Sequence, residues 1–396
     1  MKNILFFGDF DCTTGFGNVS KELVYEFSKE YFVTVFATNN YKKEPYTFSD
    51  NIYVIPALNT RDENDKDLYA RKSFLKLLYN GNYDLVFCLN DLEVINELDK
   101  HLRKVKSARK KENKKSFKSV FYFPIDSPVR KKDLNVLSFF DEAVTYTDYA
   151  KQEVKRLLGF SNSYKKLKVI PHGVSLVYKK NNETKRNKNF TFGCVNRNSV
   201  RKDFGTLLCA FADLKKDDNF KDCVLKLHCN PQDPFGLNLY RLCQRLELEI
   251  DKDVFFPDDF NENKGVSEEQ LNEFYNSIDC FITTTTAEGW GLTVHEAMAT
   301  ETLVISPMHT SLKEITNNGE CVVPISHVTE KVFKDDFEKI RYVSDTFQVT
   351  ESMKYAVDID PSVRAKKILD AKLIASKYNW KKTAEMFKKL IQKQIG

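Results

Sequence analysis

Short apolar runs alternate with helical patterns along most of this chain, and this alternation limits the possible folds more than any other feature. In the first half, runs of four to six mostly apolar residues recur at Ile4–Phe7, Phe32–Ala37, Ile52–Ile55, Leu85–Leu89, Val120–Phe123, Ala143–Tyr146 and Leu167–Ile170. Stretches with helix periodicity separate several of them. Repeated strand–helix–strand units build a parallel sheet covered on both faces. The first half is therefore predicted to be an α/β domain.

The same alternation restarts after a polar segment. Residues 179–189, KKNNETKRNKN, contain no apolar residue. New strand-like runs follow at Phe190–Val195, Val224–His228, Val254–Phe256, Cys280–Thr284, Leu303–Ser306 and Cys321–Ile325. We therefore expect a first domain over 1–178, a linker over 179–189 and a second α/β domain over 190–376. Residues 326–356 interrupt the pattern and predict only an insertion, and the chain is expected to be helical throughout from Pro361.

Composition excludes several classes of protein. With 396 residues, 42% apolar and 30% charged, the chain has the composition of a globular protein with about two domains. The apolar run at Ile4–Phe7 is too short for a signal peptide, and no run approaches a membrane span. Nine cysteines without a Cys-x-x-Cys pair predict buried thiols, with no disulfide and no zinc. We expect a cytoplasmic protein.

Residues 103–118 concentrate positive charge, with nine basic residues and one glutamate. A solvated helix end followed by a loop explains such a run without any function. An electrostatic contact with an anionic membrane surface or with a nucleic acid is the alternative, which would make the protein peripheral on the membrane in the first case.

A glycine-bearing loop follows the first predicted strand and opens a helix. Gly15-x-Gly17-x-x-Ser20 partly matches a dinucleotide fingerprint, but the third glycine is a serine and the second strand ends in two asparagines where an acid is needed. Asp9 and Asp11 could also form a metal-binding pair, although short Asp-x-Asp patterns are common. A plain loop that touches a sugar is the favoured interpretation.

The most informative segment is TTTTAEGWGLTVHEAMA, at residues 283–299. Gly289 and Gly291 leave backbone amides accessible, and a helix is expected to begin near Leu292, so an anion could rest on its amino terminus. Glu296 would lie one turn inside that helix, leaning back toward the same end. Together with Glu288 it would flank the anion. Taken alone, the two glutamates could equally be a loop acid and a surface residue.

A second anion signal follows the strand Phe190–Val195. Arg197 and Lys202 come directly after this strand and before the next helix. Because carboxyl ends of parallel strands share one edge of a sheet, both signals should lie at one site, in the cleft expected between two such domains. Cations there can neutralise a diphosphate. The two segments together predict a site for a nucleotide diphosphate.

These motifs resemble those of retaining glycosyltransferases of the GT-B fold, family 4, over nearly the whole chain. VIPHGV at 169–174 and YNWKKTA at 378–384 add to the resemblance. It implies two Rossmann-like parallel-sheet domains facing a central cleft, with a terminal helix over 377–396 that crosses back to the first domain. It also implies transfer of a hexose from a nucleotide diphosphate sugar, with UDP-sugars such as UDP-glucose as first candidates, and no metal or other cofactor. The acceptor is open: a glycan, a lipid-linked sugar or a nucleic acid.

The resemblance also implies roles for individual residues. Glu288 would contact the donor sugar, Arg197 and Lys202 would bind the diphosphate, and Glu296 would bind the ribose. Further donor-binding positions would be Gly289, Trp290, Gly291, Leu292, Thr293, Gly15 and Gly17. Acceptor-side candidates are Asp91, Asp126 and His172. Two positions depart from the family, which often has Asn in place of His172 and has a His-Asp pair in place of Asn90-Asp91.

Three alternatives stay open at this point. A carboxylate pair could act as in glycosidases. A sugar-nucleotide epimerase of related fold would release its product without an acceptor. A silent nucleotide-sugar-binding protein would bind without catalysis.

Overall fold

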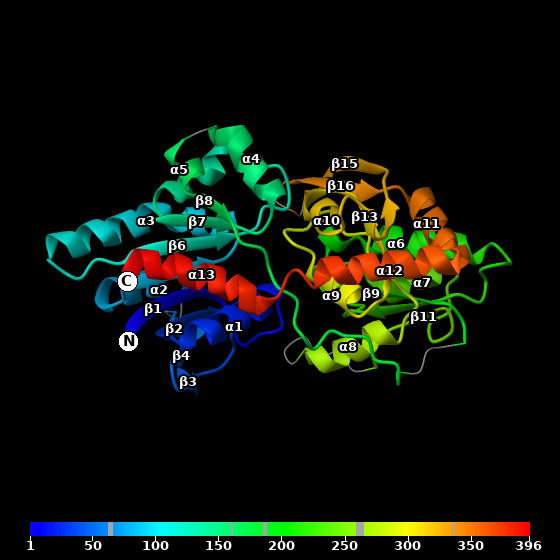
Figure 1. The fold of residues 1–396 in the computed structure, drawn as a ribbon, viewed down its shortest axis with the longest axis horizontal. Coiled ribbons are helices and arrows are strands. Elements are labelled where there is room, and N and C mark those ends of the chain that lie inside the picture. Colours follow the sequence, from blue (N-terminus) through cyan, green and yellow to red (C-terminus); the bar gives the residue numbers. More distant parts are fainter. Residues whose placement is uncertain (62–65, 160, 185–187, 259–264, 335, 337) are drawn as a thin grey trace. The chain divides into compact units, whose positions relative to one another are not determined.

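Two compact units make up the chain, described here from a computed structural model (Figure 1). The structure describes residues 1–61, 66–159, 161–184, 188–258, 265–334, 336 and 338–396. The first unit contains Met1–Ile125, Val129–Gly173 and Trp380–Gly396, and the second contains Asp126–Pro128 and Val174–Asn379. Of the predicted linker 179–189, residues 185–187 lie outside the described residues, and the other residues fall within the second unit.

A mostly parallel sheet of eight strands forms the centre of the first unit, in the order β3-β4-β2-β1-β5-β6-β7-β8. Only the pair β3 and β4 is antiparallel. The seven strands predicted from apolar runs are all present: β1 (Lys2–Asp9), β2 (Tyr31–Thr38), β4 (Ile52–Pro56), β5 (Leu85–Leu89), β6 (Lys118–Phe123), β7 (Glu142–Thr145) and β8 (Leu167–Val169). The edge strand β3 (Tyr46–Ser49) is mostly exposed, so it has no apolar run that could predict it.

The helical segments of the first unit are α1 (Gly15–Ser28), η1 (Ala57–Thr60), α2 (Arg71–Asn80), α3 (Leu92–Lys111), η2 (Lys131–Ser138), α4 (Asp148–Leu158), α5 (Asn162–Lys165) and α13 (Trp380–Ile395). α1 begins where the Thr14 hydroxyl accepts a hydrogen bond from the Gly17 amide at 2.9 Å. It packs against α13, where the ring of Phe387 lies 6.2 Å from that of Phe27. The carboxyl-terminal helix is therefore part of the first unit (Figure 1).

The second unit contains a six-stranded parallel sheet in the order β11-β10-β9-β12-β13-β14. Its strands are β9 (Thr191–Val195), β10 (Val224–His228), β11 (Val254–Phe255), β12 (Cys280–Ile282), β13 (Leu303–Pro307) and β14 (Val323–Ile325). Its helical segments are η3 (Val200–Lys202), α6 (Phe204–Lys215), α7 (Leu239–Arg245), α8 (Glu268–Asn276), α9 (Leu292–Ala299), α10 (Thr310–Ile315), α11 (Thr346–Asp358) and α12 (Pro361–Ala375). The predicted α/β class with parallel sheets is confirmed. Cysteines 194, 223, 229, 243 and 280 lie in its core, as the prediction of buried thiols requires.

The structure adds detail to two segments near the carboxyl end. The stretch 326–356, expected only to be an insertion, contains an antiparallel hairpin of β15 (Val328–Val332) and β16 (Ile340–Ser344), followed by most of α11. The expectation of unbroken helix from Pro361 is wrong at 376–379. There the chain leaves the helix because Asn379 pairs with Val174 in a β-bridge, and the Tyr378 carbonyl accepts a hydrogen bond from the Val174 amide at 3.2 Å.

The basic run 103–118 is less solvated than its composition indicates. Arg109 is 2% exposed and donates hydrogen bonds to four backbone carbonyls, three at the end of α2 and one just after α3, which makes it a structural residue. Five further cations of the run form ion pairs: Arg103–Asp99, Lys106–Asp141, Lys114–Glu112, Lys115–Asp84 and Lys118–Asp141. Within the described residues, no helix is long and apolar enough to cross a membrane.

Candidate functional site

Two loops at the carboxyl edge of the second unit's sheet are joined by hydrogen bonds. One loop follows β12 and leads into α9, and the other follows β9 and contains η3. The Thr286 amide donates to the Arg201 carbonyl at 2.8 Å, and the Thr284 hydroxyl donates to the Asp203 carbonyl at 2.8 Å. The two segments that the sequence linked to anion binding therefore lie against each other.

Glu288 joins these loops through its side chain. Its carboxylate forms an ion pair with Lys202, lies 3.2 Å from Arg201 Nη1 and accepts a hydrogen bond from the Thr285 hydroxyl at 2.9 Å. The residue is 9% exposed. Burial alone would raise the pKa of Glu288, but the charges of Lys202 and Arg201 outweigh it and lower this pKa to about 2. Glu288 is thus a buried, ionised carboxylate at neutral pH.

The backbone of Glu288 is held by the start of α10. Its amide donates to the Thr310 hydroxyl at 3.3 Å, and its carbonyl accepts from the Ser311 hydroxyl at 2.8 Å. His309 supports the same loop, because its Nε2 lies 2.9 Å from the Thr285 carbonyl. Both ends of the glutamate are therefore fixed, which keeps its position defined without a ligand.

Arg201 is a residue that the sequence analysis missed, and Arg197 has other contacts than Arg201 and Lys202 have. The Arg201 guanidinium is part of the Glu288 cluster. Arg197 instead pairs with Asp233 at 2.8 Å and lies over the ring of Phe235. The sequence signal that could have identified Arg201 is its position directly before Lys202, in the same loop.

The amino end of α9 is shaped by Gly291. This residue has φ of +103°, and a Cβ there would lie 2.8 Å from Leu312 Cδ2, so only glycine fits. The preceding Trp290 is 3% exposed and packs on His295 and Tyr378, with ring centroids 5.1 and 5.2 Å away. Gly289, Leu292 and Thr293 are partly exposed. The positive end of the helix dipole is thus held in a fixed position.

Glu296 lies inside α9, as predicted, and is 8% exposed. One carboxylate oxygen accepts a hydrogen bond from the Tyr275 hydroxyl of α8 at 2.6 Å. Burial raises the pKa of Glu296 to about 7, although the Tyr275 hydrogen bond opposes the shift. Tyr275 is a second residue that the sequence analysis missed. Its hydroxyl fixes one oxygen of Glu296.

The first unit holds the donor-binding candidates Gly15 and Gly17, which follow β1, and two acceptor-side candidates, Asp91 after β5 and His172 in a core. Gly17 opens α1, and a Cβ there would lie 2.6 Å from the Cys12 carbonyl, while Gly15 begins the helix. Asp91 is the residue before α3. His172 is 2% exposed, with Nδ1 2.7 Å from the Tyr122 hydroxyl. This places His172 in a packed aromatic cluster.

Asp126, the third acceptor-side candidate, belongs to the second unit. Its carboxylate lies 2.9 Å from Arg341 Nη1 and 3.9 Å from Lys339 Nζ. Burial would raise the pKa of Asp126, but the charges of these two residues hold it well below its usual range. Asp126 is therefore one of two counter-ions of the hairpin residue Arg341, which is 2% exposed and also pairs with Asp336.

The carboxylates of the metal-pair alternative are occupied by protein groups. Asp9 accepts hydrogen bonds from Thr14 at 2.6 Å and from Asn39 at 3.0 Å. Asp11 forms an ion pair with Lys42 at 2.7 Å. Across the part of the chain that the structure describes, no three His, Cys, Asp or Glu side chains are grouped to hold a metal ion.

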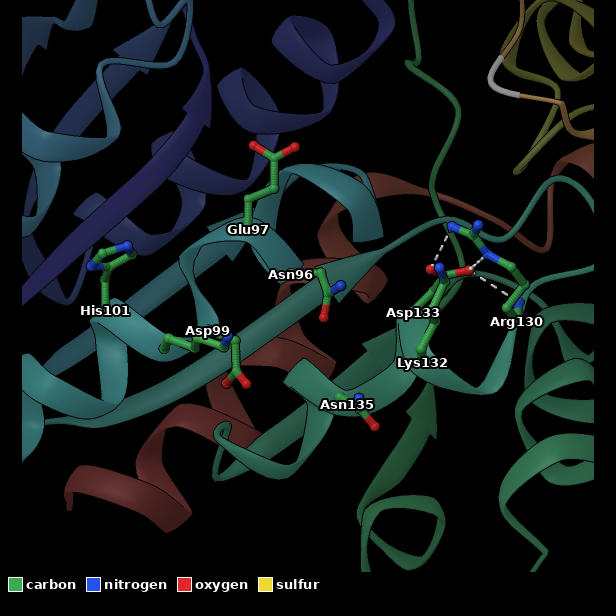
Figure 2. A pocket seen from close by; sticks show the side chains of 9 residues that line it. Asn96, Glu97, Asp99, His101, Arg130, Lys132, Asp133 and Asn135 are labelled. Carbon is green, nitrogen blue, oxygen red and sulfur yellow. Dashed lines mark hydrogen bonds and ion pairs between the residues drawn. The ribbon is translucent and has the colours of Figure 1, made fainter.

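A polar groove of about 490 Å³ opens between α3 and η2 of the first unit (Figure 2). Figure 2 shows Arg130 beside Asp133, and these side chains are joined by two hydrogen bonds of 2.9 Å. None of the predicted site residues lines the groove, and its lining has no apolar side chain. Ligand pockets are mostly apolar with a few polar groups. The groove is therefore not the candidate site.

Comparison with known proteins agrees with this geometry. Residues 178–340 match the family model described as Glycosyl transferases group 1. No curated protein sequence matches the chain significantly. Solved structures with the same fold include sucrose-phosphate synthase from Thermosynechococcus elongatus, with 15% identity, TM-score 0.75 and 99% of each chain covered.

Two further similar structures contain ligands. Anabaena HepE in complex with UDP and glucose has 15% identity and TM-score 0.69, covering 99% of this chain and 100% of that one. The trehalose-6-phosphate protein of E. coli bound with UDP-2-fluoro glucose has 11% identity and TM-score 0.68, covering 100% and 99%. The chain therefore has the GT-B fold, and residues 178–340 of its second unit match the glycosyl transferases group 1 model.

The raised pKa of Glu296 predicts a pH-dependent stability. The folded protein binds this proton more tightly than the unfolded chain, whose glutamate has a pKa of 4.5. This tighter proton binding stabilises the folded protein fully below about pH 4.5, and the stabilisation is lost as the pH rises through about 7. Between pH 5 and 8, the free energy of unfolding of the wild type should fall by about 2–3 kcal/mol relative to that of Glu296→Gln, as measured by urea unfolding.

The matched control is Glu273→Gln, at an exposed position of α8. This variant should follow the wild type at every pH. Identical pH profiles for the wild type and Glu296→Gln would show that Glu296 titrates normally in the folded protein.

Proposed function

We propose that the chain is a retaining glycosyltransferase of the family 4 type, which transfers a hexose from a UDP-sugar or a related donor without a metal ion. The observation that carries this proposal is the buried Glu288 carboxylate, kept ionised by Lys202 and Arg201 in the loop that leads into α9. The similar structures from Anabaena and E. coli, which hold UDP with glucose and UDP-2-fluoro glucose, support the choice of donor.

The proposed chemistry follows from where charge develops. Breaking the bond between the anomeric carbon and the phosphate puts negative charge on the diphosphate and positive charge on the sugar. Fixed cations and the amides at the start of α9 would stabilise the leaving group without reorganisation. The ionised Glu288 would face the sugar, and the Glu296 carboxylate would accept a ribose hydroxyl. The acceptor would enter on the face that the diphosphate leaves, and a phosphate oxygen would take its proton.

A second candidate function has one specific observation in its favour. Glu288 has a pKa of about 2 and Glu296 a pKa of about 7. Two carboxylates with pKa values this far apart are the arrangement that glycosidases use for a nucleophile and an acid. Transfer from a nucleotide donor is preferred because Lys202 and Arg201 neutralise Glu288 and would accompany an anionic leaving group.

Turnover of nucleotide sugars tests the proposal directly. A panel of nucleotide sugars should contain one donor from which nucleoside diphosphate is released, faster with a suitable sugar acceptor and unchanged by EDTA. The product should keep the anomeric configuration of the donor by NMR.

Other outcomes would replace the proposal. An epimerised sugar released without acceptor would indicate an epimerase, and cleavage of aryl glycosides would indicate a hydrolase. Tight donor binding without turnover would indicate a silent binding protein. Loss of activity with EDTA would indicate that the reaction depends on a metal ion.

The acceptor side of the proposal includes an electrostatic contact with an anionic lipid surface. Ion pairs and burial account for six of the nine cations of the run 103–118, which leaves three exposed lysines near the end of α3. These are Lys104, Lys110 and Lys111. Each lysine near an anionic surface contributes about 1 kcal/mol, so three can give only weak, salt-sensitive binding.

Replacing these three lysines by Ser should reduce binding to phosphatidylserine vesicles about 100-fold at low salt in a sedimentation assay. Donor turnover in solution should not change. The charge-matched control replaces Lys381, Lys389 and Lys393, exposed lysines of α13, and should bind like the wild type. Wild-type binding to DNA but not to vesicles, or equal loss in both triple variants, would refute the lipid contact.

A further inference from the structure

The loop after β10, residues 230–238, combines exposed apolar side chains with a buried acid. Phe235 is 67% exposed and Leu237 is 51% exposed, whereas Asp233 is 4% exposed. An exposed phenylalanine beside a buried carboxylate is an expensive arrangement unless it supports another group. The group that both of them contact is Arg197.

Asp233 is held in place by its own loop. One carboxylate oxygen accepts a hydrogen bond from the Phe235 amide at 2.8 Å, and the other lies 2.8 Å from Arg197 Nε. The Asp233 carbonyl also accepts from the Gly236 amide at 3.0 Å. Its side chain has no freedom to follow Arg197 elsewhere without breaking the turn.

Asn198 fixes this loop to the strand end that carries Arg197. Its side-chain amide donates to the Leu237 carbonyl at 2.7 Å and to the Asn230 carbonyl at 3.2 Å. The approach is so close that a Cβ on Gly236 would lie 2.3 Å from the Asn198 carbonyl oxygen. The loop and the Arg197 backbone therefore form one rigid piece.

The contacts of Arg197 with Asp233 and Phe235 do not use its two terminal nitrogens as hydrogen-bond donors. Nε is bound to Asp233, and the Phe235 ring lies 4.9 Å from the guanidinium carbon. Among the residues that the structure describes, neither terminal nitrogen of Arg197 has a hydrogen-bond partner. The side chain is 59% exposed. The two terminal nitrogens form the fork that binds phosphate oxygens in pairs.

We propose that Asp233 and Phe235 are positioning residues that hold Arg197 as a preformed fork for the donor diphosphate. This inference rests on the proposed function. An exposed arginine without support would lose its rotamer freedom on binding, and prior ordering by Asp233 and Phe235 removes that cost. The alternative is that Asp233 competes with the diphosphate for Arg197. Its single contact, to Nε, favours positioning because it leaves the terminal nitrogens available.

Calorimetric titration with UDP separates these roles. Asp233→Asn should weaken UDP binding about tenfold, and Phe235→Leu about two- to fivefold. Neither change should have any further effect when Arg197 is already Ala, because both residues act through that side chain. Phe235→Leu alters an exposed ring, so it reports on positioning even if Asp233→Asn folds poorly.

The control is Asp253→Asn, since Asp253 likewise accepts a backbone amide and pairs with a lysine, Lys215, at 2.8 Å. Its UDP affinity should equal that of the wild type. Tighter UDP binding by Asp233→Asn would mean that Asp233 competes with the diphosphate for Arg197. An equally large loss of UDP affinity in the Arg197→Ala background would mean a structural role. Either result would overturn this inference but not the proposed function. A wild-type protein that binds neither UDP, ADP nor GDP would overturn the proposed function as well.

Discussion

The ion cluster of Glu288 with Lys202 and Arg201 is the interaction on which the candidate site depends. It connects the loop after β12 to the loop after β9, and both loops come from neighbouring strands of one parallel sheet. A buried carboxylate without these cations would cost several kcal/mol. The cluster therefore decides where the chain enters α9, and with it the position of the helix amino end that Gly291 completes.

The two glutamates of the segment 283–299 differ because their surroundings differ. Glu288 has two cations beside it and stays ionised, whereas Glu296 has a tyrosine hydroxyl and a pKa of about 7. The first environment suits a group that faces developing positive charge. The second suits a hydrogen-bond acceptor for a neutral hydroxyl such as that of ribose. The segment thus carries an ionised carboxylate before α9 and, inside α9, a carboxylate that is about half ionised near pH 7.

Much of the fold could be predicted from the sequence because buried parallel strands require continuous apolar runs. β3 and β15 are largely exposed and leave no such run. In the site, glycines and glutamates with fixed spacing marked the loop into α9. Tyr275 and Asp233 could not be found this way, since each contacts its partner from a separate element, and no local pattern reports such a contact. His172 shows the converse, because a polar residue in a recognisable motif lies in an aromatic core.

Binding of UDP compared with uridine, in the wild type and in Lys202→Ala, tests whether Lys202 and the α9 amino end bind a diphosphate. We expect UDP to bind the wild type much more tightly than uridine does, because the diphosphate supplies the charge that Lys202 and the α9 amino end stabilise. In Lys202→Ala, verified as folded by its thermal midpoint, UDP affinity should fall about tenfold or more while uridine affinity stays the same. Equal UDP affinity in the two proteins, or uridine binding as tight as UDP binding, would show that these groups do not bind a diphosphate.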